Sequence, residues 1–333
     1  MEQDRIILQI NDKITKEVNF IELKDLKDLN KAITDGWTKN IVNISELLMD
    51  MRIGKIAETI SSSYSTPKFV LISGPSSSGK TTFSKRLSLH LMARGMKPFP
   101  ISIDDYFVDR VKTPIDENGE YDYESVHSVD IDLFNEHLDR LTRGEEIELP
   151  RYDFPTGTSQ KSGHKLRMEE GMILLLEGIH ALNPLLTAQI DDSLKFKVYV
   201  SALTQIAIDD QNMVHSSDNR LIRRIVRDNR TRGISPEDNI LRWPSVRRGE
   251  TRNIFPFEEN ADIVFNSSTL YDIPLLRYYA EPLLYGISEA SPAYEKAHSL
   301  LNFLDHVTAL KPSEIAAIPP TSIMREFIGG QRL

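Results

Sequence analysis

The amino-acid sequence predicts an α/β fold, because short apolar runs typical of strands alternate with stretches that have helical spacing. The first apolar run leads directly into a glycine-containing loop, and a helical pattern follows that loop. Five strand-like runs occur in all, over residues 69–72, 98–103, 172–176, 195–201 and 261–266. The chain of 333 residues is 40% hydrophobic, which suffices for one large domain or two ordinary ones.

The loop after the first run has the phosphate-loop pattern G-x-x-x-x-G-K-[ST]. It comprises Gly74, Pro75, Ser76, Ser77, Ser78, Gly79, Lys80 and Thr81, with Thr82 following. Its glycines allow successive N–H groups to turn inward around a phosphate. Lys80 is expected to approach the β- and γ-phosphate oxygens, and the Thr81 hydroxyl to ligate Mg²⁺. A helix over 82–94 would point its N-terminus at the anion. We interpret the loop as a nucleotide site; a Gly/Ser turn with a surface lysine is the alternative.

The bulk properties exclude several classes of protein. The net charge of −9 argues against a general nucleic-acid or anionic-membrane surface. The chain has no cysteine and no His-x-x-x-His spacing, so neither a thiolate nor a transition-metal site is expected. It shows no signal-peptide pattern and no run near about 18 apolar residues. We therefore expect a cytoplasmic protein without nucleic-acid or membrane partners, and homo-oligomer formation stays open.

The N-terminal residues carry no recognisable chemistry. We predict a short appendage over 1–45 and a nucleotide-binding domain over 46–333. Asn43 or Ser45 is expected to cap a helix that contains residues 46–60.

The C-terminal part has helical spacing over two stretches. These helices are expected over 273–285 and 293–304, with Pro282 and Pro292 as breaks.

Acidic residues follow two of the predicted strands. Asp104 and Asp105 come after the second run, and Glu177 comes after the third. Ligands of α/β sheets bind at the carboxyl ends of the strands. Asp104 is therefore a candidate base for an acceptor hydroxyl, Asp105 a candidate metal or water partner, and Glu177 a candidate acid near Mg²⁺. For the two aspartates, a solvated loop acid is the alternative.

A long loop and a hairpin are expected between the second and third runs. Residues 108–129 are polar and aromatic without periodicity, which is typical of a functional loop. Residues 147–168 contain two strand-like runs around a turn, which predicts a hairpin. Tyr152 and Phe154 share one face of this hairpin, where they could stack on a base or pack on the protein beneath. His180 is either a packed histidine or a ligand contact.

Ten arginines lie between residues 220 and 252. Five of them fall within about 120° on a helical projection, opposite an apolar face: Arg220, Arg223, Arg224, Arg227 and Arg230. Guanidinium groups suit phosphate oxygens, so this face is a candidate phosphate-binding surface. The alternative is a solvated charged face paired with Asp209, Asp210, Asp218 and Asp228.

These segments together resemble the uridine kinase / phosphoribulokinase family of phosphate-loop kinases. The resemblance rests on GPSSSGKTT, on the DDYF after the second run, on PRYDF, on LLLEGIHAL and on RLIRRIVRDNRTRG. WPSVRRGE, IFPFEENADIVFNSS and REFIGG are similar to a bacterial nucleoside-kinase branch often described as uridine kinase. The similarity covers residues 45 to 330.

The resemblance implies a P-loop NTPase fold, with a parallel five-stranded sheet flanked by helices, a substrate hairpin and an arginine-rich lid. It implies ATP and Mg²⁺ as cofactors and transfer of the γ-phosphoryl group of ATP to the 5′-hydroxyl of a nucleoside, uridine- or cytidine-like. Asp104 matches the general base, and Lys80 and Arg227 would act with it. Arg223 would bind the cofactor, and Thr81 and Glu177 the metal. Candidate substrate contacts are Asp104, Tyr106, Tyr123, Tyr152, Phe154, His180 and Arg220.

One position departs from the family pattern. Uridine–cytidine kinases place a histidine that reads the pyrimidine edge shortly after Tyr-Asp-Phe, where this chain has Gly157. A hydrogen bond to the base rejects analogues strongly, so pyrimidine selectivity stays open. The alternatives are a kinase for another hydroxyl acceptor, such as a sugar phosphate or pantothenate, and a nucleotide-gated regulatory module without kinase activity. The acidic charge disfavours an RNA-associated ATPase.

Overall fold

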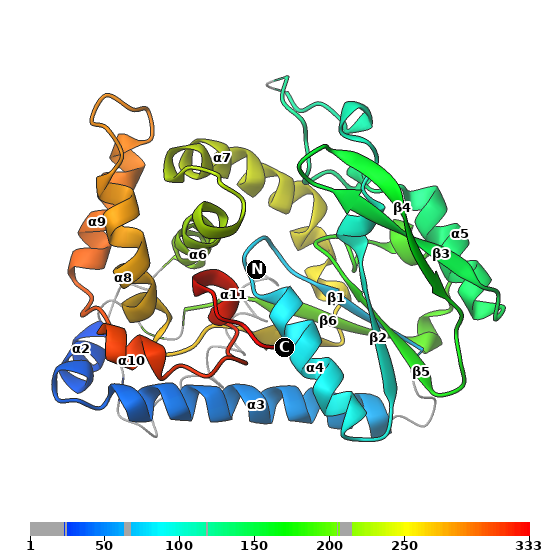
Figure 1. The fold of residues 1–333 in the computed structure, drawn as a ribbon, viewed down its shortest axis with the longest axis horizontal. Coiled ribbons are helices and arrows are strands. Elements are labelled where there is room, and N and C mark those ends of the chain that lie inside the picture. Colours follow the sequence, from blue (N-terminus) through cyan, green and yellow to red (C-terminus); the bar gives the residue numbers. More distant parts are fainter. Residues whose placement is uncertain (1–22, 24, 63–67, 118, 205, 207–214) are drawn as a thin grey trace.

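The computed structural model describes residues 23, 25–62, 68–117, 119–204, 206 and 215–333. Its centre is a parallel five-stranded sheet with the strand order β2-β5-β1-β6-β7 (Figure 1). The strands are β1 (Phe69–Ser73), β2 (Lys97–Ser102), β5 (Met172–Glu177), β6 (Lys195–Ser201) and β7 (Ile263–Asn266). The five predicted runs are confirmed. The runs of β1 and β5 are continuously apolar because these strands are buried on both faces, whereas β2 is partly exposed.

The sheet separates two hydrophobic clusters, to which β1 contributes alternate residues. Val70 and Ile72 belong to one cluster, and Phe69 and Leu71 belong to the other. This is the side-chain alternation of a strand with period two. The cluster that contains Val70 includes buried residues of α3 (Thr38–Ser62), α4 (Lys80–Met92), α6 (Ser216–Thr231), α7 (Pro236–Asn253) and α8 (Asp272–Tyr285). The cluster that contains Phe69 includes buried residues of α5 (Ile131–Thr142).

The first described helices cross the boundary expected at residue 45. α2 (Leu26–Thr34) precedes α3, and both contribute buried residues to the cluster that contains Val70. The prediction that α3 is capped by Asn43 or Ser45 is wrong, because buried Ile41 and Val42 extend its apolar face back to Thr38. The division into 1–45 and 46–333 stays a prediction, and residues 1–22 lie outside the described part.

The hairpin consists of β3 (Ile147–Asp153) and β4 (Thr158–Leu166), which pair antiparallel as predicted. It lies at the β2 side of the molecule, whereas α8 and α9 (Tyr294–Asp305) lie at the opposite end (Figure 1). The short helices α10 (Pro312–Ala316) and α11 (Arg325–Ile328) complete the chain.

Pro282 does not end its helix, contrary to expectation, and lies inside α8. A proline near a helix end removes one backbone hydrogen bond but leaves the remaining turns intact. No helix in the described part of the chain is long and apolar enough to cross a membrane.

Candidate active site

The phosphate loop joins β1 to α4 and has the strained backbone that an anion cradle requires. Gly74 and Gly79 have φ of +151° and +84°, and Ser77 also has a positive φ, +60°. A Cβ atom on Gly74 would lie 2.0 Å from the carbonyl oxygen of Val200, so this strand end admits only glycine. The close approach places the loop tightly against β6.

The loop contains polar groups that have no hydrogen-bond partner in the described part of the chain. The hydroxyl oxygens of Ser77 and Ser78 are buried and make no hydrogen bond to any described residue. The Lys80 ammonium group is buried and donates to the Pro75 carbonyl at 3.2 Å, across the loop. Unpaired hydroxyl groups in a loop that leads into the N-terminus of α4 suit the phosphates of a nucleotide. The described residues therefore fit the nucleotide that the loop pattern predicts.

Two carboxylates converge beside Lys80 because their strands are neighbours. β2 pairs with β5 so that Ser102 lies opposite Glu177, which places Asp104 beside Glu177. The Thr81 hydroxyl donates to the Glu177 carboxylate at 3.2 Å. The side chains of Lys80, Thr81, Asp104 and Glu177 therefore lie together at this edge of the sheet, where the sequence analysis placed the candidate acids.

The pKa values of both carboxyl groups are raised. Burial raises the pKa of Glu177 to about 7, and although Lys80 opposes this shift, Asp104 and Glu326 add to it. Burial also raises the pKa of Asp104, and Lys80, Arg232 and Arg227 oppose that shift. Loss of solvation of the charged carboxylates on burial is the main physical cause of both shifts. A bound divalent cation would stabilise the charged forms of these carboxyl groups. Among the described residues, no group of three or more acidic or histidine side chains could hold such an ion alone.

A third carboxyl group, Glu124, faces the site and was not foreseen. Burial raises its pKa to about 7, Glu250 adds to the shift, and Arg224 and Lys80 oppose it. A Cβ atom on Gly249 would lie 2.3 Å from the Glu124 Cβ, so the glycine in α7 allows this approach. In the sequence, the one indication of this close contact was Gly249, a glycine within a helical pattern.

An aromatic cluster on the hairpin lies next to the strand edge. Tyr152 contacts Phe107 and Phe154 edge to face, with ring centroids 5.5 and 5.1 Å apart, and Phe107 and Phe154 are 6.3 Å apart. Tyr152 is buried, Phe154 is 50% exposed, and Tyr123 of the preceding loop is 39% exposed. Asp105 anchors the cluster, because its carboxylate accepts the Tyr152 N–H at 3.4 Å.

Phe107, rather than Tyr106, is the aromatic residue that joins this cluster. The 3₁₀ turn Ile103–Tyr106 directs Tyr106 into the core. Its hydroxyl is 3.0 Å from Nδ1 of His137, and its ring packs edge to face on Phe134. The expectation that Tyr106 contacts the substrate is therefore wrong: the side chain is 2% exposed.

Gly157 has a positive φ of +71° and is covered by Arg110. A Cβ atom there would lie 2.7 Å from the Arg110 guanidinium carbon. Arg110 donates its backbone N–H to the Gly157 carbonyl at 2.8 Å and Nη2 to the Phe154 carbonyl at 2.6 Å. An arginine thus lies where a side chain at Gly157 would have projected, and sequence spacing could not show this.

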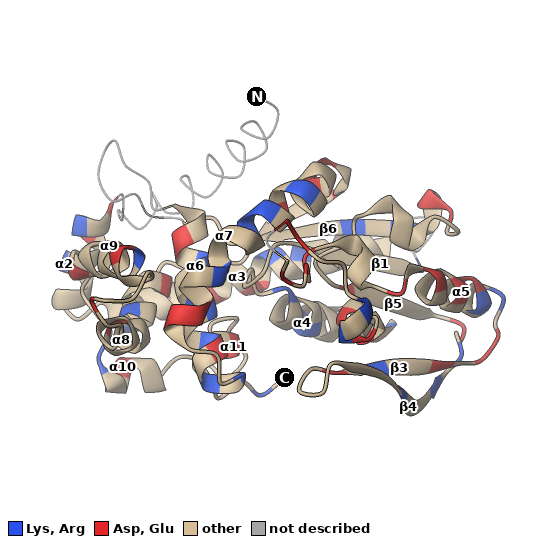
Figure 2. Ribbon diagram, turned by 90° about the horizontal axis from the view of Figure 1, so that it is seen from above, with Lys and Arg blue, Asp and Glu red and all other residues tan. Residues whose placement is uncertain are grey.

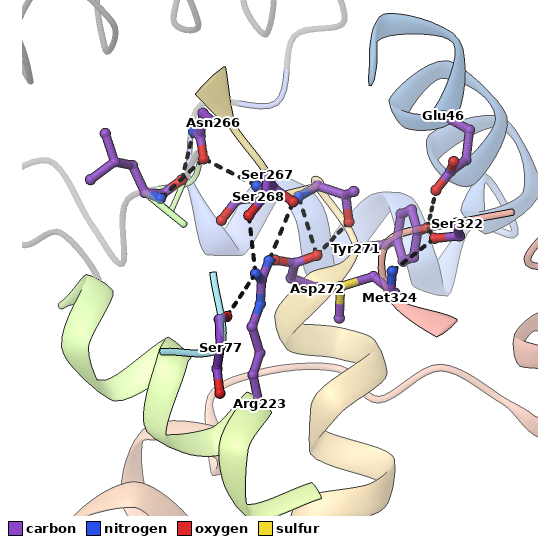
Figure 3. Close-up of polar contacts among 12 residues, drawn as sticks. Glu46, Ser77, Arg223, Asn266, Ser267, Ser268, Tyr271, Asp272, Ser322 and Met324 are labelled. Atoms are coloured by element: carbon purple, nitrogen blue, oxygen red, sulfur yellow. Dashed lines mark hydrogen bonds and ion pairs between the residues drawn. The ribbon is translucent and has the colours of Figure 1, made fainter. Parts of the chain in front are cut away.

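The arginines of α6 are mostly buried in ion pairs. Arg220 pairs with Glu250, and Arg223 pairs with Asp272 (Figure 3). The predicted Asp228 lies 2.7 Å from Arg227 and 3.4 Å from Arg224. Two acids that the sequence analysis did not name also pair with this face, since Glu250 comes from α7 and Asp272 from α8. Figure 2 shows acidic and basic residues close together around α6 and α7. Of the other expected partners, Asp218 pairs with Lys296 at 2.8 Å, and Asp209 and Asp210 lie outside the described residues.

The same arginines brace the phosphate loop from its outer side. Arg220 donates to the Ser76 carbonyl at 3.1 Å, and Arg224 donates to the Ser76 hydroxyl at 3.2 Å. Arg223 reaches the Ser77 carbonyl at 3.5 Å. α6 therefore positions the loop backbone, which is a role distinct from direct phosphate contact.

His180 lies behind the strand ends and is 1% exposed. Burial lowers its pKa to about 4, so the ring is neutral near pH 7. This environment is that of a packed histidine.

A parallel sheet with a phosphate loop at its central strand, and with carboxylates at the neighbouring strand ends, defines a phosphate-loop kinase. The model of the Phosphoribulokinase / Uridine kinase family matches residues 69–274. The chain belongs to this family, as the sequence resemblance predicted, and is an ATP-dependent kinase. Membership implies ATP and a divalent metal as cofactors.

The chain is similar to curated proteins and to solved structures. It is 31% identical over 201 residues to a uridine kinase of Bacillus pumilus, covering 60% of this chain and 86% of that one. It is 30% identical over 199 residues to a uridine kinase of Anoxybacillus flavithermus, covering 60% and 85%. The structure of D-glycerate 3-kinase from Cryptococcus neoformans aligns with a TM-score of 0.43 at 15% identity, over 63% of this chain and 89% of that one.

Proposed function

We propose that this kinase transfers the γ-phosphoryl group of ATP to the 5′-hydroxyl of a uridine- or cytidine-like nucleoside. The position of Asp104 carries the proposal, because it lies at a strand end beside Lys80 on one side and Glu177 on the other. A neighbouring aromatic cluster offers a surface for a flat base. The relatives named uridine kinase support the substrate class.

Phosphoryl transfer has a loose transition state, so catalysis consists mainly of positioning and charge neutralisation. Lys80 and Arg227 supply positive charge near the transferring group, and Asp104 orients the hydroxyl and accepts its proton. The raised pKa of Asp104 suits a base that works near neutral pH. Thr81 and Glu177 would hold Mg²⁺, which would supply positive charge to neutralise the phosphates.

The nucleoside base would stack against the exposed ring of Phe154, near Tyr123. Replacing Phe154 with Ala is expected to raise KM for the nucleoside about tenfold, since stacking on a base contributes about 1–3 kcal/mol. KM for ATP should not change, because the ring contacts of Phe154 are with Phe107 and Tyr152 rather than with the phosphate loop. Initial rates at varied nucleoside and varied ATP measure both constants. The control is Tyr285→Ala, an exposed aromatic residue on α8. An unchanged nucleoside KM would remove Phe154 from the acceptor site.

Glu177 makes Mg²⁺ binding dependent on pH. Its carboxyl group is protonated below about pH 7, so protons compete with the metal there. The Mg²⁺ concentration for half-maximal activity is expected to rise up to about tenfold per pH unit between pH 7 and pH 5.5, and to be constant above pH 7.5.

Magnesium titrations at fixed ATP, repeated over this pH range, measure the effect. In Glu177→Gln the dependence should vanish and the Mg²⁺ requirement should be high at every pH. Exposed Glu169, changed to Gln, is the control. A dependence that persists in Glu177→Gln contradicts the assignment.

A different hydroxyl acceptor is the second candidate, and Arg110 is the observation that favours it. Its Nε atom is buried beside the aromatic cluster and makes no hydrogen bond to any described residue. A phosphate or carboxylate on the acceptor would satisfy that donor. A sugar phosphate or pantothenate carries such a group.

The test is ADP release from ATP and Mg²⁺ across nucleosides, sugars, sugar phosphates and pantothenate. Turnover with one class of nucleoside to a 5′-monophosphate supports the proposal. Turnover with only another acceptor overturns the substrate and keeps the mechanism. ATP binding with no acceptor-dependent turnover would indicate a regulatory module. We expect the enzyme in the cytoplasm, where ATP and nucleosides occur together; formation of a homo-oligomer stays a prediction.

A further inference from the structure

The C-terminal segment, residues 318–331, packs against the phosphate loop, although it lies beyond the family match at 69–274. α11 lies between α6 and the start of α4 (Figure 1). Ile323, Met324 and Phe327 in this segment are fully buried. A part of the chain outside the matched region therefore covers the nucleotide-binding loop.

The segment places a carboxylate on the first turn of α4. Glu326 Oε2 accepts the backbone N–H of Thr82 at 3.2 Å and the Thr82 hydroxyl at 2.7 Å. Gln331 donates to the same hydroxyl at 2.6 Å, and its amide oxygen accepts from Lys85 at 3.2 Å. Thr82 is 0% exposed as a result. Its amide and hydroxyl are both occupied by C-terminal side chains.

Contacts on either side fix the segment in this position. A Cβ atom on Gly79 would lie 2.7 Å from the Ile323 side chain, so the segment touches the loop itself. The Phe327 ring lies 5.1 Å from the Arg223 guanidinium carbon, and Ser322 is 2.9 Å from the Tyr271 hydroxyl (Figure 3). Arg230 donates to the Phe327 carbonyl at 3.1 Å.

A nucleotide and Glu326 compete for the same donor. The first backbone N–H groups of a helix have no partner within the helix, and in a phosphate loop they cradle the α- and β-phosphates. Glu326 takes one of these groups, the Thr82 N–H. A carboxylate and a phosphate repel each other at this distance, and Glu326 already acts on Glu177 by charge. The two anions therefore exclude each other at Thr82.

We propose that Glu326 is a built-in competitor of the donor phosphates, which holds Thr82 in the nucleotide-free protein and is displaced when a nucleotide binds. Displacement releases the C-terminal segment from α4, so the segment reports the occupancy of the loop. Glu326 thereby sets the affinity for the donor nucleotide. This inference rests on the proposed function only in that the donor binds the phosphate loop; it does not depend on the acceptor.

Titration calorimetry with ATP and with inorganic triphosphate tests the competition. Glu326→Gln keeps the shape and removes the charge, so Kd for both ligands should fall by about tenfold. Gln331→Ala should also lower Kd, but by a smaller factor. This variant tests the proposal if Glu326→Gln does not fold. Exposed Glu289, changed to Gln, makes the same change of net charge and should leave Kd as in the unmodified protein.

An unchanged or higher Kd in both Glu326→Gln and Gln331→Ala would overturn the proposal and make Glu326 a permanent cap of α4. The proposed function survives that result if the unmodified protein still turns over. If neither the unmodified protein nor any variant binds ATP or triphosphate, the assignment of the loop to the donor nucleotide fails.

Hydrogen–deuterium exchange of the unmodified full chain gives a readout without mutation. Adding ATP should speed amide exchange in residues 322–331 and slow it in the first turn of α4. Slower or unchanged exchange in residues 322–331, at a saturating ATP concentration, contradicts displacement.

Discussion

Replacing Asp104 with Asn is expected to lower kcat by a factor of about 10²–10⁴ and to leave Kd for ATP within about twofold. The amide retains the size of the side chain and its ability to orient a hydroxyl, but it cannot accept the proton. In the proposed mechanism Asp104 acts on the acceptor, whereas the loop backbone and Lys80 bind ATP. The loss should therefore appear in turnover rather than in donor binding.

Acceptor-dependent ADP formation and calorimetry with ATP measure the two quantities separately. Asp132→Asn on the exposed side of α5 is the matched control. A kcat within a factor of about three of the unmodified enzyme, for the acceptor that the panel identifies, removes Asp104 from the proton transfer.

Replacing Lys80 with Ala is expected to lower kcat/KM by about 10³-fold or more, because the transferring group loses its nearest fixed positive charge. A second effect follows from the electrostatics of the strand edge. Lys80 lowers the pKa of both Asp104 and Glu177. Without it both carboxyl groups bind protons more tightly, so the residual activity should require a higher pH than the unmodified enzyme does.

A profile of kcat/KM against pH, from pH 6 to pH 9, measures both effects. Lys39→Ala, an exposed lysine on α3, is the control for loss of a positive charge. A near-normal kcat/KM in Lys80→Ala would contradict a catalytic role for the loop. A large loss with an unshifted pH profile would mean that Lys80 does not act on the two carboxyl groups.

The sequence by itself determined the sheet and the phosphate loop. The loop pattern is local, since glycines, Lys80 and Thr81 must follow one another for the backbone to turn around an anion. The central strands β1 and β5 were also predictable, because burial on both faces leaves continuous apolar runs. The convergence of Asp104 and Glu177 followed from the general position of ligands at strand ends, and the pairing of β2 with β5 produces it.

The tertiary structure alone decided which partners these residues have. The helical projection grouped the α6 arginines correctly, but Glu250 and Asp272 pair with them from 30 and 49 residues away. The choice between Tyr106 and Phe107 depended on one 3₁₀ turn, which periodicity does not reveal. Glu326 lies 244 residues from Thr82. Such contacts arise when separate elements pack on a common core, and a pattern of neighbours along the chain carries no information about them.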